Sequence, residues 1–319
     1  MRVLELLASP IFFSIRLPEA YQVATSLLLP PPSAISGALA YSYAIWKDVK
    51  FQDSLEKFAN SWCFTIPCAP IIQSSIILRR LRLLQAGESF ARSKKEWERI
   101  LKKIPSNVKS ELEKRGLLDR SKLRYRHDFL RVLKDIRSDY YWRYYRETLF
   151  DAMIRGYVFT DSLYLGCLLS FEEEFMPCFT RLGDTESYLA IKELQFIDSF
   201  ELKRISKGNE IESYSYVFLK YGGKALVKPM VDSLIQPLSA PGFLIERLKG
   251  RKRAKYQYVL PAILPLRREV RRIAGKDVEI FYPRKIRVKV LSEVYLLSYE
   301  SKILKREVSI IIPEEAIPR

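Results

Sequence analysis

Three consecutive prolines, Pro30, Pro31 and Pro32, constrain the fold of this chain more than any other short stretch. Each proline fixes φ and lacks an N–H donor, so the run cannot lie inside a helix or a central strand. The apolar segment that starts at Leu27 must therefore end there, and Ser33 becomes the predicted N-cap of a following helix. The run thus predicts a joint at which one element ends and a helix begins.

The predicted helix after the prolines is rich in small residues, and Gly37 lies among them. Glycine lowers helix propensity by about 1 kcal/mol relative to alanine, so its presence there indicates close packing, here against a sheet. The joint has two interpretations. It is a structural turn between strand and helix, or it is a helix start whose free N–H groups face a phosphate.

Basic residues outnumber acidic residues by 54 to 37, which gives a formal net charge of +17. The excess lies in residues 79–155 and 246–289, where basic residues exceed acidic ones by 11 in each region. Such a distribution favours an anionic partner, with nucleic acid ahead of a membrane surface. The first residues lack the cleavage pattern of a signal peptide, and no apolar run is long enough to cross a bilayer. We therefore expect a cytoplasmic protein without a membrane partner.

The residue types that usually carry catalysis are scarce in this chain. His127 is the one histidine, so zinc binding and histidine-dependent nucleophilic chemistry would all rest on it. The acidic residues 172–174 could hold a cation, although a solvated loop is the plainer interpretation. The cysteines lack the CxxC spacing of metal or redox sites, and we expect reduced thiols. The four cysteines are Cys63, Cys68, Cys167 and Cys178. The sequence therefore predicts no catalytic residue, no metal and no cofactor.

The order of sequence patterns predicts an α+β fold with a charged helical insertion. Residues 1–87 form the first part of the core, and residues 3–16 within it read as one or two strands broken by Pro10. Residues 88–150 carry charges at helical spacing and form the insertion. Residues 151–319 return to strand-like patterns and include a basic region. One alternating strand is expected from Lys285, Ile286, Arg287, Val288, Lys289 and Val290, with the aliphatic residues on one face and the basic residues on the other.

Two stretches are candidates for contact with RNA on composition alone. Residues 138–150 interleave Arg143 and Arg146 with tyrosines and a tryptophan, and such planes can stack on unpaired bases while the cations meet the backbone. The alternative is a helix that packs its tyrosines within its own domain. Residues 249–256 are basic with no neutralising acid, which favours phosphate contact. The basic residues of this second stretch are Lys249, Arg251, Lys252, Arg253 and Lys255.

Two motifs resemble signatures of a known family. LLLPPPSAISGALAYSYA, residues 27–44, resembles the proline-rich turn and first helix of the Cas-five family of CRISPR-associated proteins. RLGDTESYLAI, residues 181–191, resembles a second signature of that family, seen particularly in the archaeal subtype I-A branch. The order and separation of the two motifs fit the family as well. The resemblance covers most of residues 1–85 and 150–200, and residues 281–290 are a weaker echo of the family's C-terminal end.

The resemblance implies a ferredoxin-like, RRM-type βαββαβ core of the RAMP superfamily. It also implies a non-catalytic subunit that binds the 5′ handle of the CRISPR RNA in a Cascade complex. The implied protein partners are the backbone subunit and the large subunit, with target DNA as a further partner, and residues 88–150 would correspond to the family's thumb. The RNA-binding residues carried over by motif are Pro31, Pro32, Ser33 and Gly37 from the first motif, and Arg181, Gly183, Thr185 and Ser187 from the second.

Two alternatives remain at the level of sequence. One is an endoribonuclease of the RAMP type that processes CRISPR repeat RNA, because cleavage needs no metal if a Lys, Tyr or His is well placed. The glycine-rich C-terminal loop of those nucleases is not visible in this sequence. The other is a related subunit of a type III effector complex, since the charged insertion and the basic C-terminal stretch match no motif of the family.

Overall fold

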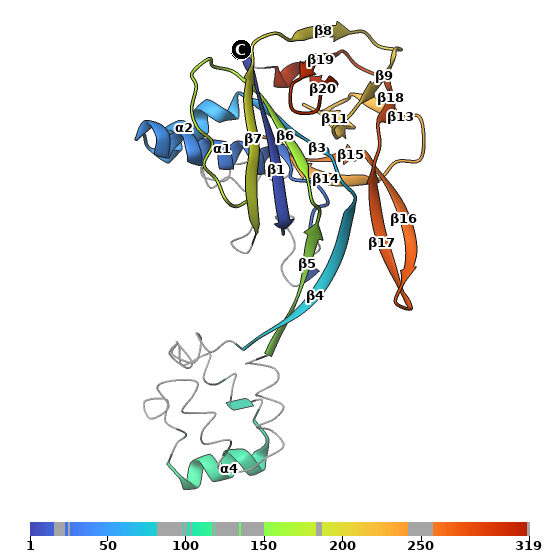
Figure 1. Ribbon diagram of the computed structural model, residues 1–319. Helices are drawn as coiled ribbons and strands as arrows, with labels where there is room; N and C mark the ends of the chain where they lie inside the picture. The colour runs from blue at the N-terminus through green and yellow to red at the C-terminus, as the bar shows by residue number, and fades with distance from the viewer. Residues whose placement is uncertain are drawn as a thin grey trace. The chain divides into compact units, whose positions relative to one another are not determined.

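The computed structural model (Figure 1) describes residues 1–15, 23–24, 26–81, 98, 101–102, 104–116, 118, 134, 150–182, 187–241 and 258–317. The chain divides into two compact units. Unit 1 contains Met1–Ile76 and Arg155–Arg319, and unit 2 contains Ile77–Ile154. The sequence placed the insertion at residues 88–150. Within unit 2 the structure describes one complete helix, α4 (Ser106–Lys114), which buries Val108 and Leu112.

The central sheet of unit 1 has four antiparallel strands in the order β3-β6-β1-β7. Of its two middle strands, β6 is buried along its whole length, and β1 is buried from Val3 to Leu6 and partly exposed toward its end. Phe64 of β3 lies over Gly166 of β6, where a Cβ atom would be 2.2 Å from the ring. The bounds of the strands are Arg2–Phe12 for β1, Trp62–Pro67 for β3, Leu163–Leu169 for β6 and Tyr188–Ile197 for β7.

Pro10 does not break the first strand, contrary to the sequence prediction. β1 continues through it to Phe12, and the pairing with β7 shifts register between Pro10 and Phe12. A proline cannot donate to a ladder, so it is tolerated in a strand at such an irregularity. The chain after the shift makes an isolated bridge, in which Phe13 and Val158 exchange backbone hydrogen bonds of 2.9 Å.

The expected helix after the proline run is present as α1 (Pro32–Lys47). It begins two residues earlier than predicted: Pro31 is the N-cap, and no side chain caps the helix. The prediction that Ser33 is the N-cap is therefore wrong, because proline at the first helical position already has a suitable φ and needs no N–H partner. Ile35 and Leu39 are buried, and the Ser36 hydroxyl lies 3.3 Å from Cys63 Sγ on β3, so the small residues do permit close approach to the sheet.

The helix α2 (Phe51–Ala59) follows α1, and the helical spacing of Phe51, Leu55 and Phe58 in the sequence predicts it. It buries Leu55 and Phe58. The Phe58 ring packs edge-on against Tyr43 of α1 and against Phe175, with ring centroids 5.9 and 5.6 Å apart. The apolar faces of the two helices thus belong to the same core as the sheet.

The cysteine prediction is wrong for one pair. Cys63 and Cys167 are joined by a disulfide, with Cα atoms 4.0 Å apart. The two residues face each other directly in the register of β3 and β6, and such a cross-strand position brings side chains together whatever their separation in sequence. Cys68 and Cys178 are free and exposed, in agreement with the prediction of reduced thiols.

The connection between β6 and β7 differs from the βαββαβ pattern. Its described residues, 170–182 and 187, contain no helix. Pro177 lies in the middle of this segment, and a proline there disfavours a helix. Phe175 and Phe179 are buried instead, so the segment is held by single aromatic side chains rather than by a helical face.

No described helix combines the length and apolar content that crossing a bilayer requires.

The other sheets contain the strands that follow β7 in the chain together with β2, β4 and β5. A five-stranded sheet has the order β16-β17-β4-β5-β2, and three-stranded sheets have the orders β10-β15-β14, β13-β18-β9 and β20-β19-β8. The strands β11 and β12 pair by themselves. The bounds are Val23–Ala24 (β2), Ile71–Leu81 (β4), Phe150–Phe159 (β5), Glu201–Ile205 (β8), Glu210–Ser213 (β9), Val217–Phe218 (β10), Lys220–Tyr221 (β11), Lys224–Ala225 (β12), Val227–Pro229 (β13), Ile235–Ser239 (β14), Val259–Ile263 (β15), Leu266–Ile273 (β16), Lys276–Pro283 (β17), Ile286–Val290 (β18), Val294–Ser301 (β19) and Arg306–Pro313 (β20), followed by the short helix η3 (Glu314–Ala316).

The alternating strand near the C-terminus is confirmed as β18. Ile286, Val288 and Val290 are buried, while Arg287 and Lys289 are exposed. The exposed face is less basic than the sequence alone indicates, because the neighbouring strand β9 contributes carboxylates opposite these cations.

Candidate nucleic-acid interface

The short segment that follows β1 is hydrogen-bonded to both sequence motifs. The backbone N–H of Ser14 donates to Ser187 Oγ of the second motif at 3.0 Å. One residue later, the N–H of Ile15 donates to Ser26 Oγ at 3.0 Å, and the N–H of Leu27 donates to the carbonyl of Ile15 at 2.8 Å. The segment 13–15 therefore joins the start of the proline motif to the end of the second motif.

Arg181 and Tyr188 flank the second motif on its exposed side. The Arg181 guanidinium carbon lies 5.5 Å from the centroid of the Tyr188 ring, and half of the Tyr188 side chain is exposed. The N–H of Leu189 donates to the carbonyl of Thr180 at 3.0 Å, which brings the two ends of the segment together. A cation over an aromatic face is attracted by the ring quadrupole, so the contact orients both side chains.

Two phenylalanines extend this exposed surface. Phe12 lies opposite Tyr188 in the register of β1 and β7, and its ring centroid is 6.1 Å from that of Phe159 on β5. Phe159 is 37% exposed, and Phe12 also rests edge-on against Tyr157 at 5.6 Å. We call Phe12, Phe159, Arg181 and Tyr188 the aromatic–arginine cluster.

The aromatic–arginine cluster has the chemistry of a single-strand binding surface. Exposed aromatic faces can stack with unpaired bases, and a guanidinium can bind a phosphate or stack on a base itself. Isolated exposed aromatics are common on protein surfaces, but here three rings and one arginine converge from three strands and a loop. Sequence reasoning identified Arg181 alone among these four residues.

The residues of the proline motif lie mostly inside the protein. Pro31, Pro32 and Ser33 are buried, and Gly37 is half-buried. The Ser33 hydroxyl shares a hydrogen bond with the hydroxyl of Ser239 on β14. These side chains hold the turn in place, and a contact with RNA at this position would have to come from its backbone or from neighbouring residues.

The start of α1 offers fewer donors than the sequence indicated. Pro31 and Pro32 have no N–H group, and the N–H groups of Ala34 and Ile35 both point to the carbonyl of Pro31, at 3.0 and 3.4 Å. Within the described residues, the Ser33 N–H is the donor of this turn that makes no hydrogen bond. The expected set of free N–H groups is thus reduced to one.

The remaining predicted RNA-binding residues lie outside the described part of the chain. They stay predictions, and His127 also lies outside the described residues. The residues are Arg143, Arg146, Gly183, Thr185, Lys249, Arg251, Lys252, Arg253 and Lys255.

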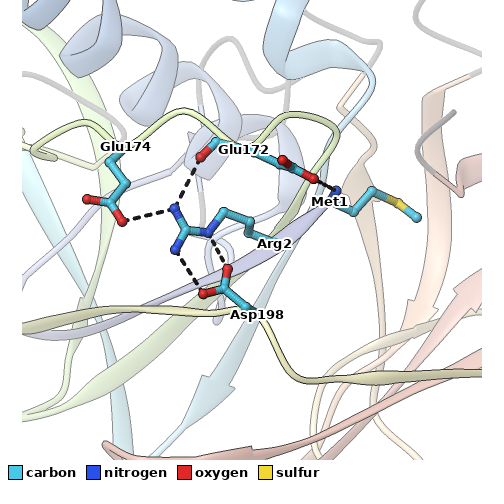
Figure 2. A network of polar contacts seen from close by, with 5 residues as sticks. All are labelled: Met1, Arg2, Glu172, Glu174 and Asp198. Atoms are coloured by element: carbon cyan, nitrogen blue, oxygen red, sulfur yellow. Dashed lines mark hydrogen bonds and ion pairs between the residues drawn. The ribbon is translucent and has the colours of Figure 1, made fainter.

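The acidic run of residues 172–174 ties the β6–β7 connection to the rest of unit 1 (Figure 2). Glu174 accepts a hydrogen bond of 2.9 Å from Arg2 of β1, and the same guanidinium forms two hydrogen bonds, of 2.5 and 3.1 Å, with Asp198. The Arg2 guanidinium lowers the pKa of the Asp198 carboxyl. Glu172 accepts from the N-terminal amine of Met1 at 3.4 Å. The run is therefore a solvent-exposed loop, as the sequence predicted, and its carboxylates form ion pairs with the rest of unit 1.

The exposed cations of β18 are similarly paired. Glu212 of β9 accepts from Arg287 at 2.9 Å and from Lys285 at 3.4 Å, and these bonds lower its pKa. Lys285 and Arg306 also lie over the Tyr214 ring, at 4.7 and 4.4 Å from its centroid.

Over the described ranges, no group of three or more His, Cys, Asp and Glu side chains gathers where it could hold a metal ion.

Comparisons with known proteins complete the description. No family model matches this chain, and no curated protein matches its sequence. Among solved structures, the chain is similar to a CRISPR protein from Archaeoglobus fulgidus, with a TM-score of 0.42 and 13% sequence identity. The alignment of the two covers 98% of this chain and 99% of that chain.

Proposed function

We propose that this chain is a non-catalytic RNA-binding subunit of a Cascade-type CRISPR interference complex, and that it holds the 5′ handle of the guide RNA. The observation that carries the proposal is that one short segment after β1 is hydrogen-bonded to both motifs. The Ser14 N–H donates to Ser187 Oγ of the second motif at 3.0 Å, across 173 positions of sequence, and the Ile15 carbonyl accepts from the Leu27 N–H of the first motif at 2.8 Å. The resemblance of each motif to the same family thus corresponds to one place in the fold.

The topology of the central sheet supports the ferredoxin-like assignment. Numbered along the chain, the four strands have the spatial order 2-3-1-4, and the first connection contains the helices α1 and α2. A βαββαβ ferredoxin-like unit has the same order, with a helix in each of its two crossovers. In this chain the second crossover is the extended segment of residues 170–182, which departs from that unit.

The exposed chemistry supports a single-stranded RNA rather than a duplex. Tyr188 presents an aromatic surface beside Arg181, and Phe159 is a further exposed ring. Bases are available for stacking only where they are unpaired. The excess positive charge of the whole chain favours the same partner through its phosphates. We propose the backbone and large subunits of the complex as protein partners on the basis of the family resemblance.

The test is a titration of the purified protein with RNA carrying the 5′ handle and with a scrambled strand of equal length. Arg181→Ala should weaken the handle complex by about 1–3 kcal/mol, because a charge-assisted hydrogen bond is lost, and should weaken the scrambled complex less. The matched control is Arg204→Ala, which removes an exposed arginine that is ion-paired with Glu293 and Glu314 on another sheet.

Two outcomes would contradict the proposal. Equal losses on both RNAs would place Arg181 in the general electrostatic surface and would remove the second motif from handle recognition. Specific cleavage of labelled repeat RNA in EDTA would favour an endoribonuclease instead, since metal-independent cleavage needs only well-placed acid–base groups.

A further inference from the structure

The strands β16 and β17 form a two-stranded arm that is exposed on both faces. No residue from position 267 to position 279 is buried, and Val270 and Ile273 are about half exposed. The arm is attached to its sheet through two register pairs, Ile280 with Ile72 and Phe281 with Ile71, and the rest of it extends as the orange hairpin of Figure 1. A two-stranded hairpin without a packed face gains little stability by itself, which suggests that a ligand uses it.

The two faces of the arm differ in charge. On the face that carries Tyr282, Arg267 and Arg271 share one carboxylate: Glu269 lies 3.6 Å from the first and 2.7 Å from the second. Both guanidinium carbons also approach the Tyr282 ring, at 6.0 and 5.4 Å from its centroid. Two arginines thus approach one ring and share a single negative charge. Lys276 of β17 lies on the same face by register.

The opposite face is close to neutral. Arg268 is hydrogen-bonded to Glu279 of the facing strand, and Arg272 lies opposite Asp277 in register. Each arginine on this face therefore has a carboxylate across the hairpin, whereas the Tyr282 face has an uncompensated cation even before Lys276 is counted.

Protection of a sheet edge is the simplest alternative explanation, because β16 ends the five-stranded order and charged residues keep edge strands from pairing with other chains. Edge protection requires charge but no particular sign, and it does not require two guanidinium groups to converge on one ring. The charge difference between the faces is what an anionic ligand would require.

We propose that the Tyr282 face of the arm binds the phosphate backbone of single-stranded RNA, with Arg267 and Arg271 as the phosphate-binding residues. The inference rests on the proposed function and extends it to a second contact, separate in sequence from the two motifs. Cations beside an aromatic ring are typical of surfaces that track a single strand. Binding at this face should depend on phosphates and not on base identity.

The test compares RNA affinities at fixed salt and the salt dependence of each. Arg267→Gln combined with Arg271→Gln should weaken binding of both handle and scrambled RNA by about tenfold or more. The slope of log affinity against log salt should become shallower by about 1.4, which is 0.7 for each lost phosphate contact on a single strand. Glu269→Gln should tighten binding a few-fold, because it frees both guanidinium groups from their shared carboxylate.

Two control variants separate the arm from general charge. Arg268→Gln with Glu279→Gln alters the opposite face and leaves the net charge unchanged, so affinity should be retained. Lys220→Gln with Lys228→Gln removes two exposed cations from other strands and should weaken binding clearly less than the arm variant. Thermal unfolding midpoints establish that each variant is folded. If the double arginine variant does not fold, Glu269→Gln tests the proposal by itself.

Three further outcomes would each overturn a proposal. Wild-type protein that does not bind the handle RNA overturns the proposed function and the arm together. Wild-type binding with no change in the arm variant overturns the arm alone. A loss confined to duplex DNA of the same length, with single-stranded RNA unaffected, assigns the arm to a duplex backbone and overturns the inference as stated.

Discussion

Glu173 joins three parts of unit 1 through one carboxylate. It accepts hydrogen bonds from the Tyr43 hydroxyl of α1 and, at 2.9 Å, from Lys57 Nζ of α2. The bond from Tyr43 and then that from Lys57 lower the pKa of the Glu173 carboxyl. Lys57 also lies over the Phe171 ring at 4.4 Å. The chain before β7 is therefore fastened to both helices in the absence of a helix of its own.

The lowered pKa predicts an acid-dependent loss of stability. A carboxyl whose pKa is lower in the folded state contributes stability above its unfolded pKa, near 4.3, and loses that contribution as pH falls through the folded pKa. Glu173→Gln should therefore destabilise the protein by less than about 1 kcal/mol at pH 7, since the pair is half exposed and screened. The difference from wild type should shrink as the pH falls from 7 to 3.

Urea unfolding at both pH values measures this effect. Glu56→Gln is the matched control, because Glu56 is an exposed glutamate of α2 that forms no ion pair with the described residues. A loss for Glu173→Gln that persists unchanged at pH 3 would mean that the side chain acts through packing and not through its charge.

At the scale of elements, the turn of the β16–β17 arm carries a correctable strain. Ala274 and Gly275 connect the register pair Ile273 and Lys276, and their φ angles are +49° and +79°. A two-residue hairpin turn with positive φ at both positions favours Asn-Gly. An alanine held there costs about 1–2 kcal/mol relative to its preferred conformation.

Ala274→Asn should therefore stabilise the arm by about 0.5–1 kcal/mol, because asparagine tolerates the left-handed region better. Hydrogen exchange at the backbone amides of the arm should slow two- to fivefold, an estimate that follows from about 1.4 kcal/mol per factor of ten. Gly275→Ala is the opposite control: nothing lies within 4 Å of its added Cβ, so any faster exchange would reflect backbone strain alone. Faster exchange in Ala274→Asn would contradict the turn geometry.

The elements that follow from local physics were predictable from sequence. α1, α2 and β18 are present where proline placement, helical spacing and strict alternation indicated them. The cysteine pair was missed because its partners are 104 residues apart and meet only through strand register. Pro10 was expected to interrupt the first strand, but a register shift in the pairing of β1 with β7 accommodates it.

The candidate site was less predictable than the fold. Arg181 stood out because it begins a motif, whereas Phe12, Phe159 and Tyr188 belong to three different strands and become neighbours only through pairing. One signal was present: large aromatic residues at the ends of strands, where alternation no longer requires burial. The Tyr282 face of the arm was hidden for the same reason, since its asymmetry depends on which carboxylate faces which arginine.

At the scale of the whole molecule, charge is the property that every proposed contact shares. The net charge of +17 lies largely in two regions of the sequence, and within the described residues many cations are paired with carboxylates, as Arg2, Arg204 and Arg287 are. The cations available for RNA are therefore fewer than the sequence count. The number of phosphates that the protein neutralises must be measured rather than counted from composition.

Salt dependence supplies that measurement. If four or five phosphates are engaged, log affinity for a single strand should fall with log salt at a slope of about −3, from 0.7 for each phosphate. The slope for the handle should be steeper than that for scrambled RNA by at most about 0.7, the share of one phosphate bound by Arg181, so the ratio of the two affinities should fall only slowly as salt rises. A ratio that collapses toward one at high salt would mean that handle preference is itself electrostatic. A slope near zero would assign the basic regions to a protein partner, and the RNA-binding proposal would then have to be abandoned.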